Sequence, residues 1–396
     1  MPRLVKIATY YKGGLNYYYN RFPDVINLPY DKQLRHLLDF RLGWSDYYQK
    51  ALEKLGFEAY EIIANAQPLQ RRWAKDHGKE YSFLGTVYDQ VTHLRPDIVW
   101  FQNSINFPAD FVEKIRQLGV QLLIGNICSP YTRDHLKIFR LFDFVVTCSP
   151  EMEENLNKAG IKTLLIYHAF SPDVLSQLPE EKKKYNTVFV GSLINAPGFH
   201  DLRIKILDEL IRRGVEMEVF ANVQDASLAE VLPKQIFYIL AKVLKYTPLK
   251  KNFRMQKALA LTEMPKWNKL PSSLRKHLRP AVFGLDMFRT VKLASISVDV
   301  HATVQRYAAN MRLFETPGVG TILLTQNFVN LPELFEPDKE VITYSSTDEA
   351  KEKINYLLDH PTEAEKIARA AQKRVLKDHT YDNRARILKQ EIEKHL

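Results

Sequence analysis

Short apolar runs alternate with amphipathic stretches along the first half of the chain. The runs are rich in Val, Ile and Leu and show little polar alternation, which is typical of strands that are buried on both faces of a parallel sheet. On this pattern we expect strands at Leu4–Tyr10, Ala59–Ala64, Asp97–Gln102, Val120–Gly125, Phe142–Cys148 and Lys162–His168.

Amphipathic segments with helix start and stop residues separate these strands. Ser45–Leu55 opens on Ser and ends before Gly56, and Phe107–Leu118 ends before Gly119. Ser149–Ala159 begins Ser-Pro-Glu, which places a capping Ser before a Pro in the first turn. An alternation of strand and helix predicts βαβ units around a mostly parallel sheet.

The same alternation starts again after a polar linker. Ser171–Asn186 carries two Pro and a run of two Glu and three Lys, with little to bury. Beyond it we expect strands at Thr187–Val190, Val215–Ala221, Leu293–Val300, Thr321–Thr325 and Glu340–Tyr344, and helices at His200–Arg213, Asp348–Leu358, Thr362–Leu376 and Tyr381–Leu396. Two halves of this kind predict two doubly wound α/β domains that face each other across a cleft, with ligands at the carboxyl ends of the strands.

These patterns divide the chain into four parts. Residues 1–170 form a first Rossmann-like domain, and residues 171–186 form the linker. Residues 187–378 form a second Rossmann-like domain, which a basic helical insertion interrupts at 231–292. Residues 379–396 form a last helix that can cross back to the first domain.

The positive charge of the chain is concentrated in the insertion. The net charge is +10, but Val231–Lys292 alone holds ten Lys and four Arg against one Glu and one Asp. Such a segment indicates an anionic partner, either a membrane surface, a nucleic acid or a phosphorylated substrate. Apolar residues alternate with Lys there, which favours an interfacial helix on anionic lipid; a solvated helix packed on the domain is the alternative. No nucleic-acid partner is expected, because no recognised binding module accompanies the charge.

Composition excludes several other classes of protein. At 396 residues, 45% hydrophobic and 26% charged, the chain is neither disordered nor collagen-like and is long enough for two domains. Cys128 and Cys148 are too few for a disulfide framework or a four-ligand zinc site, so a reducing cytosol is the expected compartment. The first residues show no signal-peptide pattern, and no run of about 18 uncharged apolar residues predicts a membrane span. We therefore expect a cytoplasmic protein that can lie peripherally on the inner face of the membrane.

The segment with the most specific chemistry is Asn310–Thr325. Within it a short helix carries Arg312 and Glu315 three residues apart, so that both side chains lie near one face. Gly318 and Gly320 follow in a turn whose backbone can approach a ligand closely, and a buried strand comes next. A carboxylate in this place can accept both hydroxyls of a ribose, and an Arg can hold a diphosphate through paired N–H bonds. The plain alternative is a surface ion pair before an ordinary turn.

This segment resembles the C-terminal half of GT-B glycosyltransferases. The likeness continues through Asn330–Tyr344 and His379–Arg384, and it is greatest to the CgeB-like, or spore-maturation-protein-like, group. It covers residues 186–384 apart from the basic insertion, and the first half more weakly.

One spacing carries most of the resemblance. In the wider retaining GT-B group, a Glu followed five residues later by Gly and then by a buried strand binds the nucleotide ribose, and Glu315 and Gly320 match that spacing. That group usually has another Glu eight residues earlier, where this chain has Tyr307. The resemblance therefore gives no stereochemical outcome for the reaction.

The resemblance implies a nucleoside-diphosphate-sugar donor in the cleft, with the first domain on the acceptor side. The donor would be bound mainly by the second domain, at Asn310, Arg312, Glu315, Gly318 and Gly320. We expect a hexosyltransferase-type enzyme without a metal, because no Asp-x-Asp pair ends a strand and enzymes of this fold stabilise the leaving diphosphate with helix N-termini and basic side chains. No cofactor is expected, since the nucleotide sugar is a substrate.

Two further segments are candidates for contact with the donor phosphates. Gly191 and Ser192 end a strand and offer backbone N–H groups, unless they form only a strand-ending turn. Gly13 and Gly14 follow the first strand, where many GT-B enzymes carry a Gly-Gly loop; a plain turn is the alternative. The tyrosines at positions 10, 11, 17, 18 and 19 could stack on a sugar, although such clusters more often pack together.

Catalytic side chains are less sharply indicated. His301 ends a strand and could donate to a phosphate or to the transferred sugar, or it could be a structural histidine. His36 and Asp46 are candidates for a base that activates the acceptor hydroxyl, and Asp39 and His168 are further ones.

The leading hypothesis is a glycosyltransferase of cell-surface polysaccharide or glycolipid synthesis, with a saccharide or lipid-linked acceptor. The alternative is a non-catalytic protein that binds a sugar nucleotide or an anionic lipid on the same fold. A third hypothesis, in which the basic segment binds nucleic acid, predicts a steep salt dependence that deletion of residues 231–292 removes.

Overall fold

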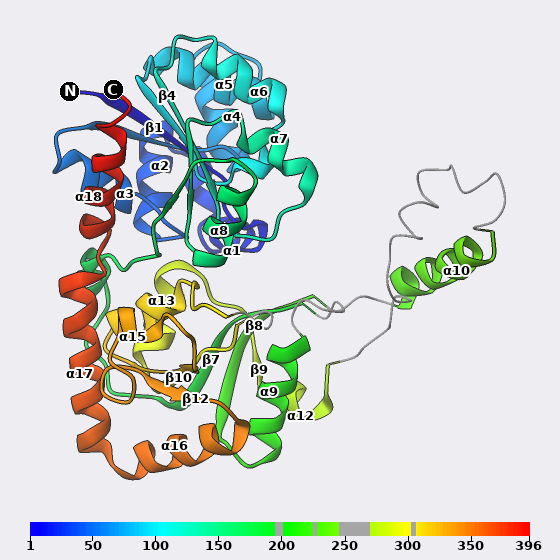
Figure 1. Cartoon of the computed structure of the whole chain (residues 1–396), viewed down its shortest axis with the longest axis vertical. Helices are drawn as coiled ribbons and strands as arrows, with labels where there is room; N and C mark the ends of the chain where they lie inside the picture. The colour runs from blue at the N-terminus through cyan, green and yellow to red at the C-terminus, as the bar shows by residue number, and fades with distance from the viewer. Residues whose placement is uncertain (195–200, 225–227, 245–269, 302–305) are drawn as a thin grey trace.

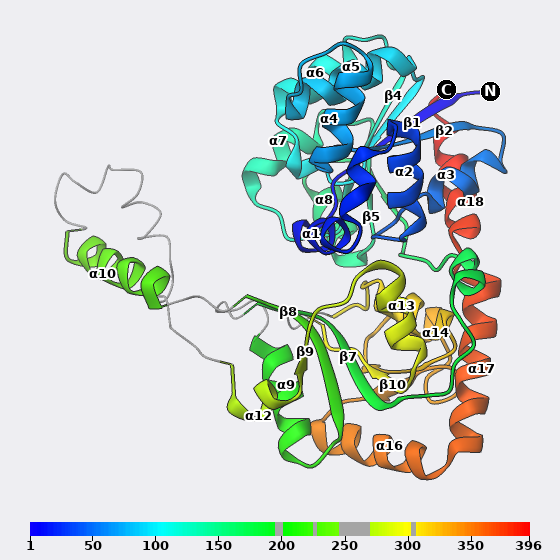
Figure 2. The same cartoon turned by 180° about the vertical axis from the view of Figure 1, so that it is seen from behind.

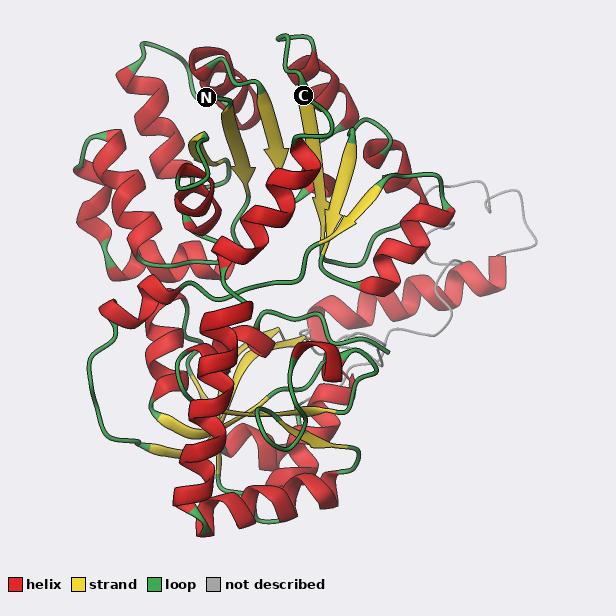
Figure 3. Ribbon diagram, turned by 60° about the vertical axis from the view of Figure 1, so that its left-hand side comes forward, coloured by secondary structure: helices red, strands yellow, loops and turns green. Residues whose placement is uncertain are grey.

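The protein contains two parallel β-sheets, one in each half of the chain (Figure 1). The structure is a computed structural model that describes residues 1–194, 201–224, 228–244, 270–301 and 306–396. Helices flank both sheets, which gives each half the layered form that the alternation of strand and helix predicts (Figure 3).

The first sheet has the strand order β2-β1-β3-β4-β5-β6, and every pairing in it is parallel. Its strands are β1 Arg3–Ala8, β2 Glu58–Ile63, β3 Ile98–Phe101, β4 Leu122–Ile127, β5 Phe144–Thr147 and β6 Thr163–Leu165. All six predicted strands are confirmed, and β3, β4 and β5 are buried along their whole length. The unbroken apolar runs therefore reflect strands that are covered on both faces.

The second sheet has the order β12-β11-β10-β7-β8-β9 and is also parallel. Its strands are β7 Tyr185–Ile194, β8 Met217–Gln224, β9 Leu278–Arg279, β10 Ala294–Val298, β11 Ile322–Gln326 and β12 Ile342–Tyr344. The sequence did not predict β9, because a two-residue strand leaves no periodic pattern.

Eight α-helices accompany the first sheet among the described residues. They are α1 Lys12–Arg21, α2 Tyr30–Asp39, α3 Tyr47–Glu53, α4 Gln67–Asp76, α5 Phe83–Leu94, α6 Ala109–Arg116, α7 Leu136–Phe139 and α8 Pro150–Lys158. The predicted helices correspond to α3, α6 and α8. The expected Gly-Gly loop after the first strand is instead the first turn of α1, which is a correction to the sequence interpretation.

The helices of the second half are α9 Asp201–Arg212, α10 Leu228–Leu244, α12 Ser272–Lys276, α13 Gly284–Lys292, α14 Arg312–Gly318, α15 Leu331–Leu334, α16 Thr347–Asp359, α17 Pro361–Asp378 and α18 Tyr381–Ile392. The four helices expected here are confirmed as α9, α16, α17 and α18. His200, the expected start of α9, lies outside the described residues.

The basic segment is only partly a separate structure. Helix α10 projects away from the rest of the chain (Figure 1, Figure 2). From Leu270 onward the chain belongs to the second half: β9 pairs with β8, and α13 buries Met287, Phe288 and Val291. Residues 245–269, which hold much of the positive charge, lie outside the described residues. No described helix is both long and apolar enough to cross a bilayer.

The linker is more ordered than its composition suggests. Pro172–Gln177 forms a 3-10 helix, in which Val174 is fully buried. Leu178 is also buried, and β7 already begins at Tyr185. The expectation that this stretch has little to bury is therefore wrong, because its few apolar side chains join the main core.

The last helix returns to the first half of the chain. Thr380 caps α18 in a reciprocal arrangement with Asn383, so that a new helix begins directly after α17 ends. Helix α18 then packs against α3, where the ring of Tyr381 contacts Tyr47 and Tyr48. The two halves are thus joined by the linker and by this C-terminal crossing.

Two buried histidines meet at this crossing. Arg384 of α18 donates to the backbone oxygen of His168 and, at 2.9 Å, to Nδ1 of His379. Burial, followed by the charge of Arg384, lowers the pKa of His168 to about 4. Burial is also the main cause that lowers the pKa of His379 to about 4. Both rings are therefore neutral in the folded protein at pH 7.

Acid is expected to destabilise the protein through these histidines. Their pKa values in the folded protein lie below the ordinary value for histidine. The stability that the two neutral rings contribute is therefore complete above about pH 6.5 and is lost as the pH falls toward 4. We expect the free energy of unfolding to decrease by about 1–3 kcal/mol per histidine over this range, measured by urea denaturation at pH 7, 6, 5 and 4. His168→Gln and His379→Asn should flatten the profile; an unchanged slope in both variants would contradict the assignment.

Candidate functional site

The strand order of the second sheet marks one place where a ligand is expected. Strands β7 and β10 are neighbours, but from them the chain leads outward in opposite directions, to β8 and to β11. In doubly wound sheets, ligands bind beside the carboxyl ends of the two strands at such a switch point. Here those ends bring together Ser192 of β7 and Asp299, which directly follows β10.

Arg203 ties the two strand ends to each other. Its guanidinium donates to the backbone oxygen of Ser192 at 2.9 Å and to that of Val300 at 2.8 Å. Burial is the first cause that lowers its pKa, with Asp299 acting in the opposite direction. Arg203 therefore places a partly desolvated positive charge at the switch point.

Asp299 is the centre of a buried polar cluster. Both carboxylate oxygens accept from Nδ2 of Asn310 at 2.8 Å, and one accepts from Thr325 Oγ1 at 3.2 Å. Nε2 of His301 lies 3.6 Å from the same carboxylate. Sequence reasoning missed Asp299, although an acid directly after a buried strand and two residues before a histidine is a usable signal.

This cluster also positions α14. Oδ1 of Asn310 accepts from the backbone N–H of Leu313 at 3.1 Å, while its Nδ2 group is held by Asp299. The first turn of α14 is thereby fixed relative to the end of β10. His301 is buried, and its ring packs against Phe328 with the ring centroids 4.3 Å apart.

Helix α14 brings Arg312 and Glu315 together, as their spacing predicts. The two side chains form an ion pair, and Arg312 Nε donates to the backbone oxygen of Val190 at 3.2 Å. Glu315 is 5% exposed, and burial raises the pKa of its carboxyl while Arg312 lowers it. The pair therefore lies beside the end of β7, close to Gly191 and Ser192, where a diphosphate is expected.

The two glycines after this pair have packing roles. A Cβ on Gly318 would lie 2.4 Å from the ring of Phe170, which comes from the first half of the chain. Gly320 has a φ of +77° and follows the end of α14, so a side chain there would be strained. The structure therefore gives both residues a function in packing and chain reversal, and the ligand contact expected from the sequence stays a prediction.

The start of α1 approaches the second half from across the domain interface. The Cβ position of Gly13 is 3.5 Å from the side chain of Asn222 at the end of β8 and from the ring of Phe283. Gly14 faces Leu42 and the same ring. The carboxyl edges of the two sheets thus meet here, as Figure 2 shows for α1 and α13. Tyr17 confirms this contact, since its hydroxyl donates to Asp286 at 2.9 Å.

Tyr11 is the member of the tyrosine cluster that faces solvent. Its side chain is 86% exposed, and the pKa of its hydroxyl is raised, first by the protein mass near it. Cys128 and Cys148 act in the same direction and Arg312 opposes them, so residues of both halves lie within its electrostatic range. Tyr10 and Tyr18 are buried, which supports packing over sugar stacking for those two residues.

His36 and Asp46, the candidate acceptor-side bases, have structural partners in the first half. Nδ1 of His36 lies 2.8 Å from the hydroxyl of Tyr18, within an aromatic cluster. Asp46 is buried and is paired with Arg41 at 2.5 Å and Lys50 at 3.1 Å. Asp46 is therefore already held by two cations of the first half.

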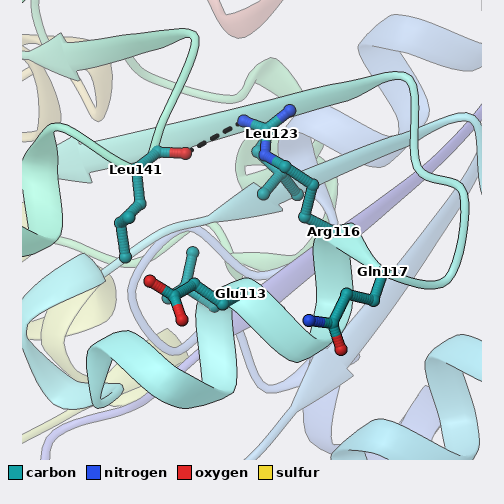
Figure 4. Close-up of a pocket in the computed structure, with 6 residues that line it drawn as sticks. Glu113, Arg116, Gln117, Leu123 and Leu141 are labelled. Carbon is teal, nitrogen blue, oxygen red and sulfur yellow. Dashed lines mark hydrogen bonds between the residues drawn. The ribbon is translucent and has the colours of Figure 1, made fainter.

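Surface hollows occur beside both sheets, at the amino end of a strand in the first and at the carboxyl ends of two strands in the second. One is lined by Glu113, Arg116, Gln117, Leu123 and Leu141, and Arg116 donates to the backbone oxygen of Leu141 at 2.9 Å (Figure 4). It lies at the amino end of β4, opposite to the edge where ligands are expected. Another is lined by Gln326 and Tyr344 at the carboxyl ends of β11 and β12. This second hollow adjoins the Asp299 cluster, because Tyr344 donates to the backbone oxygen of Asp299 at 3.2 Å.

Comparison with known proteins finds a family model and solved structures that this chain resembles. A family model described as "Glycosyl transferase-like" matches residues 245–390, which include the Arg312–Glu315 pair. No curated protein matches the sequence.

Solved structures match the whole chain. HepE from Anabaena, in complex with UDP-glucose, aligns over 100% of both chains with a TM-score of 0.55 and 11% identity. Sucrose-phosphate synthase from Thermosynechococcus elongatus covers 100% of this chain and 99% of its own, with a TM-score of 0.53 and 11% identity. An α-glucosyltransferase in complex with UDP and a 13-mer DNA covers the same shares, with a TM-score of 0.56 and 10% identity. The chain therefore has the GT-B fold.

Proposed function

We propose that the protein is a glycosyltransferase that moves a sugar from a nucleoside-diphosphate sugar to a saccharide or lipid-linked acceptor. The observation that carries this proposal is the Arg312–Glu315 pair at the switch point of the second sheet, within the region that matches the family model. A buried carboxylate and a guanidinium in this place fit the ribose and the diphosphate of a nucleotide. The complexes of HepE with UDP and UDP-glucose support a nucleotide-sugar donor.

The roles in this reaction follow from the positions of the groups. Glu315 would accept hydrogen bonds from the ribose hydroxyls, which compensates the cost of its burial. Arg312 would turn from Glu315 to the diphosphate and stabilise the charge of the leaving group. The first turn of α1, with Gly13 and Gly14, would supply backbone N–H groups from the other half. Asn310 and His301 would hold α14 in place against the end of β10. None of these steps requires a metal.

A thermal-shift screen against UDP-, GDP-, dTDP- and CMP-sugars tests this function. A donor that binds only the folded protein raises the apparent stability, by about 2.7 kcal/mol at a hundredfold excess over Kd. The screen is followed by measurement of donor hydrolysis and sugar transfer. Binding without either reaction would favour the non-catalytic alternative, and no binding in the whole panel would contradict the proposal.

Loss of Arg312 is expected to weaken binding of phosphates more than binding of the nucleoside. We expect Arg312→Gln to reduce the affinity for UDP, or for the diphosphate of the donor found, by about 10–100-fold, because a charge-assisted hydrogen bond contributes about 1.5–3 kcal/mol. Affinity for the nucleoside should change little in calorimetry. Arg306→Gln is a matched control, since Arg306 is exposed in the loop that precedes α14. An equal loss for nucleoside and diphosphate would contradict the assigned role.

The exposed face of α10 supports a membrane location for this enzyme. Leu232, Ile236, Ile239, Leu240 and Val243 follow helical spacing, and they are 48–68% exposed. Apolar residues at this spacing form one stripe along the helix. The sequence around the stripe is strongly basic, which complements anionic headgroups. We propose that α10 lies in the interface of an anionic membrane, on its cytoplasmic side, where lipid-linked or cell-surface glycans are assembled.

Vesicle sedimentation tests the membrane contact. Ile236→Asp with Ile239→Asp should lower binding to vesicles with anionic lipid by more than about tenfold, since each buried side chain of this size contributes about 1.5–3 kcal/mol. Gln235→Asp on the same helix is the control for added charge. Equal binding of all variants, or equal binding to vesicles without anionic lipid, would contradict the proposal.

A further inference from the structure

The two cysteines of the chain lie side by side at the carboxyl edge of the first sheet. Cys128 directly follows β4 and Cys148 directly follows β5, and the last register pair of these strands joins Ile127 to Thr147. Neighbouring strands are about 4.8 Å apart, which is within the range of Cα separations that a disulfide spans. The two Sγ atoms and a ring nitrogen of His168 lie within 4.8 Å of one another.

The two sulfurs have different surroundings. Cys128 is partly exposed, and its sulfur is 3.8 Å from Nδ2 of Asn126, a buried donor. Cys148 is buried. A hydrogen bond with Cys128, and then burial, raise the pKa of Cys148 well above its usual range. Cys128 is therefore the sulfur that a reagent in solvent reaches first, and Cys148 is the protonated partner beside it.

The hydrogen bonding of His168 favours a disulfide between Cys128 and Cys148. It argues against a metal ion bound by Cys128, Cys148 and His168 together. The indole N–H of Trp44 donates to Nδ1 of His168 at 3.2 Å, and a Trp side chain can only donate. The proton of the neutral imidazole is consequently on Nε2, which leaves that nitrogen without a lone pair for a metal ion. Binding of a metal through Nδ1 would require the contact with Trp44 to break.

We propose that Cys128 and Cys148 form a reversible disulfide, which makes this pair an oxidation site on the acceptor-side wall of the domain interface. With a hydroperoxide as oxidant, the Cys128 sulfur attacks the peroxide oxygen, the O–O bond breaks and water or an alcohol leaves, which yields a sulfenic acid. The Cys148 sulfur then displaces hydroxide, which takes up the thiol proton as water, and the S–S bond forms. The peroxide is reduced by two electrons in total. Both cysteines lie at the carboxyl edge of the first sheet, the edge from which α1 meets the second half of the chain.

Mass spectrometry of the full chain tests this directly, since the chain has 2 Cys in all. The reduced protein is treated with one equivalent of hydrogen peroxide, quenched with N-ethylmaleimide and digested without reductant. We expect a mass loss of two hydrogens, a Cys128–Cys148 crosslinked peptide, no maleimide adduct, and two adducts after dithiothreitol. An intermolecular disulfide, or oxidation of Cys128 to a sulfinic acid with Cys148 still free, would overturn the proposal.

Single variants assign the roles of the two sulfurs. In Cys148→Ser, dimedone should trap the sulfenic acid on Cys128; in Cys128→Ser, peroxide should consume the remaining thiol at least about tenfold more slowly. Equal rates in the two variants would overturn the assignment. A parallel sample receives one equivalent of Zn²⁺ alone, and protection of both thiols from maleimide by this ion would replace the disulfide with a metal site. None of these measurements uses transferase activity, so they stand apart from the proposed function.

Discussion

Replacement of Glu315 by Ala is expected to remove most of the affinity for the sugar nucleotide. The buried carboxylate would contribute two hydrogen bonds to the ribose, and bonds to a charged group are worth about 1.5–3 kcal/mol each. We therefore expect Kd for the donor, measured by isothermal titration calorimetry, to rise about 10²–10³-fold. Affinity for the 2′-deoxy analogue of the nucleotide should be low for both proteins, because that analogue lacks one of the two hydroxyls.

The controls separate a lost contact from a lost fold. Glu315→Gln keeps the shape of the side chain but weakens its acceptor oxygens, so it should fall between Ala and the parent protein. Glu333→Ala removes an exposed acid from the neighbouring helix α15 and should bind donor normally. Urea denaturation of each variant gives the stability change, since Arg312 loses its partner in Glu315→Ala. Normal donor affinity in a folded Glu315→Ala protein would contradict the proposed site.

The order of strands and helices in the chain could be predicted because the strands are buried on both faces. An unbroken apolar run such as β4 is visible in the sequence, and the Gly residues that end several helices mark where the alternation turns. Helix α1 could not be predicted in the same way. It begins Lys-Gly-Gly, which disfavours a helix, and it is held by contacts with Phe283 and Asp286 from the other half of the chain.

The candidate site was predictable only where local spacing determines it. Arg312 and Glu315 meet because they are three residues apart on one helix, and this holds in any fold that forms the helix. The partners of Asp299 come from residues 310 and 325, which meet only after the sheet has formed. In the same way, Cys128 and Cys148 are neighbours through the register of two strands, and a count of cysteines does not show this.

The buried ion pair of Lys6 and Glu61 in the first sheet gives the second large prediction. These residues are register partners in β1 and β2, and Nζ of Lys6 lies 3.0 Å from the Glu61 carboxylate. Lys6 also donates to the backbone oxygen of Ser45 at 3.3 Å. Burial is the main cause that raises the pKa of Glu61 to about 8, and Lys6 acts against it. Two neighbouring strands therefore share one ionisable pair that is almost completely enclosed.

Lys6→Met is expected to destabilise the protein by about 3–5 kcal/mol at pH 8 and above, where Glu61 would otherwise ionise beside its cation. The pKa of Glu61 is raised in the folded state, so its folded form binds the proton more tightly than the unfolded chain does. Stability therefore falls as the pH rises from about 4.5 toward 8, and the fall should be steeper in Lys6→Met, where no cation opposes it. Urea denaturation at pH 6, 7 and 8 measures this slope.

The double variant Lys6→Met, Glu61→Leu decides whether charge or packing is responsible. Replacement of both partners by apolar groups of similar size removes the buried charge, and such exchanges are often neutral or stabilising by about 1–4 kcal/mol. We expect the double variant to recover most of the loss and to show no pH slope from this site. If it is as unstable as Lys6→Met alone, the loss comes instead from the contacts of the Lys6 ammonium with Ser45 and with the rings of Trp44, Tyr48 and Trp100, which lie 5.7–6.0 Å from it.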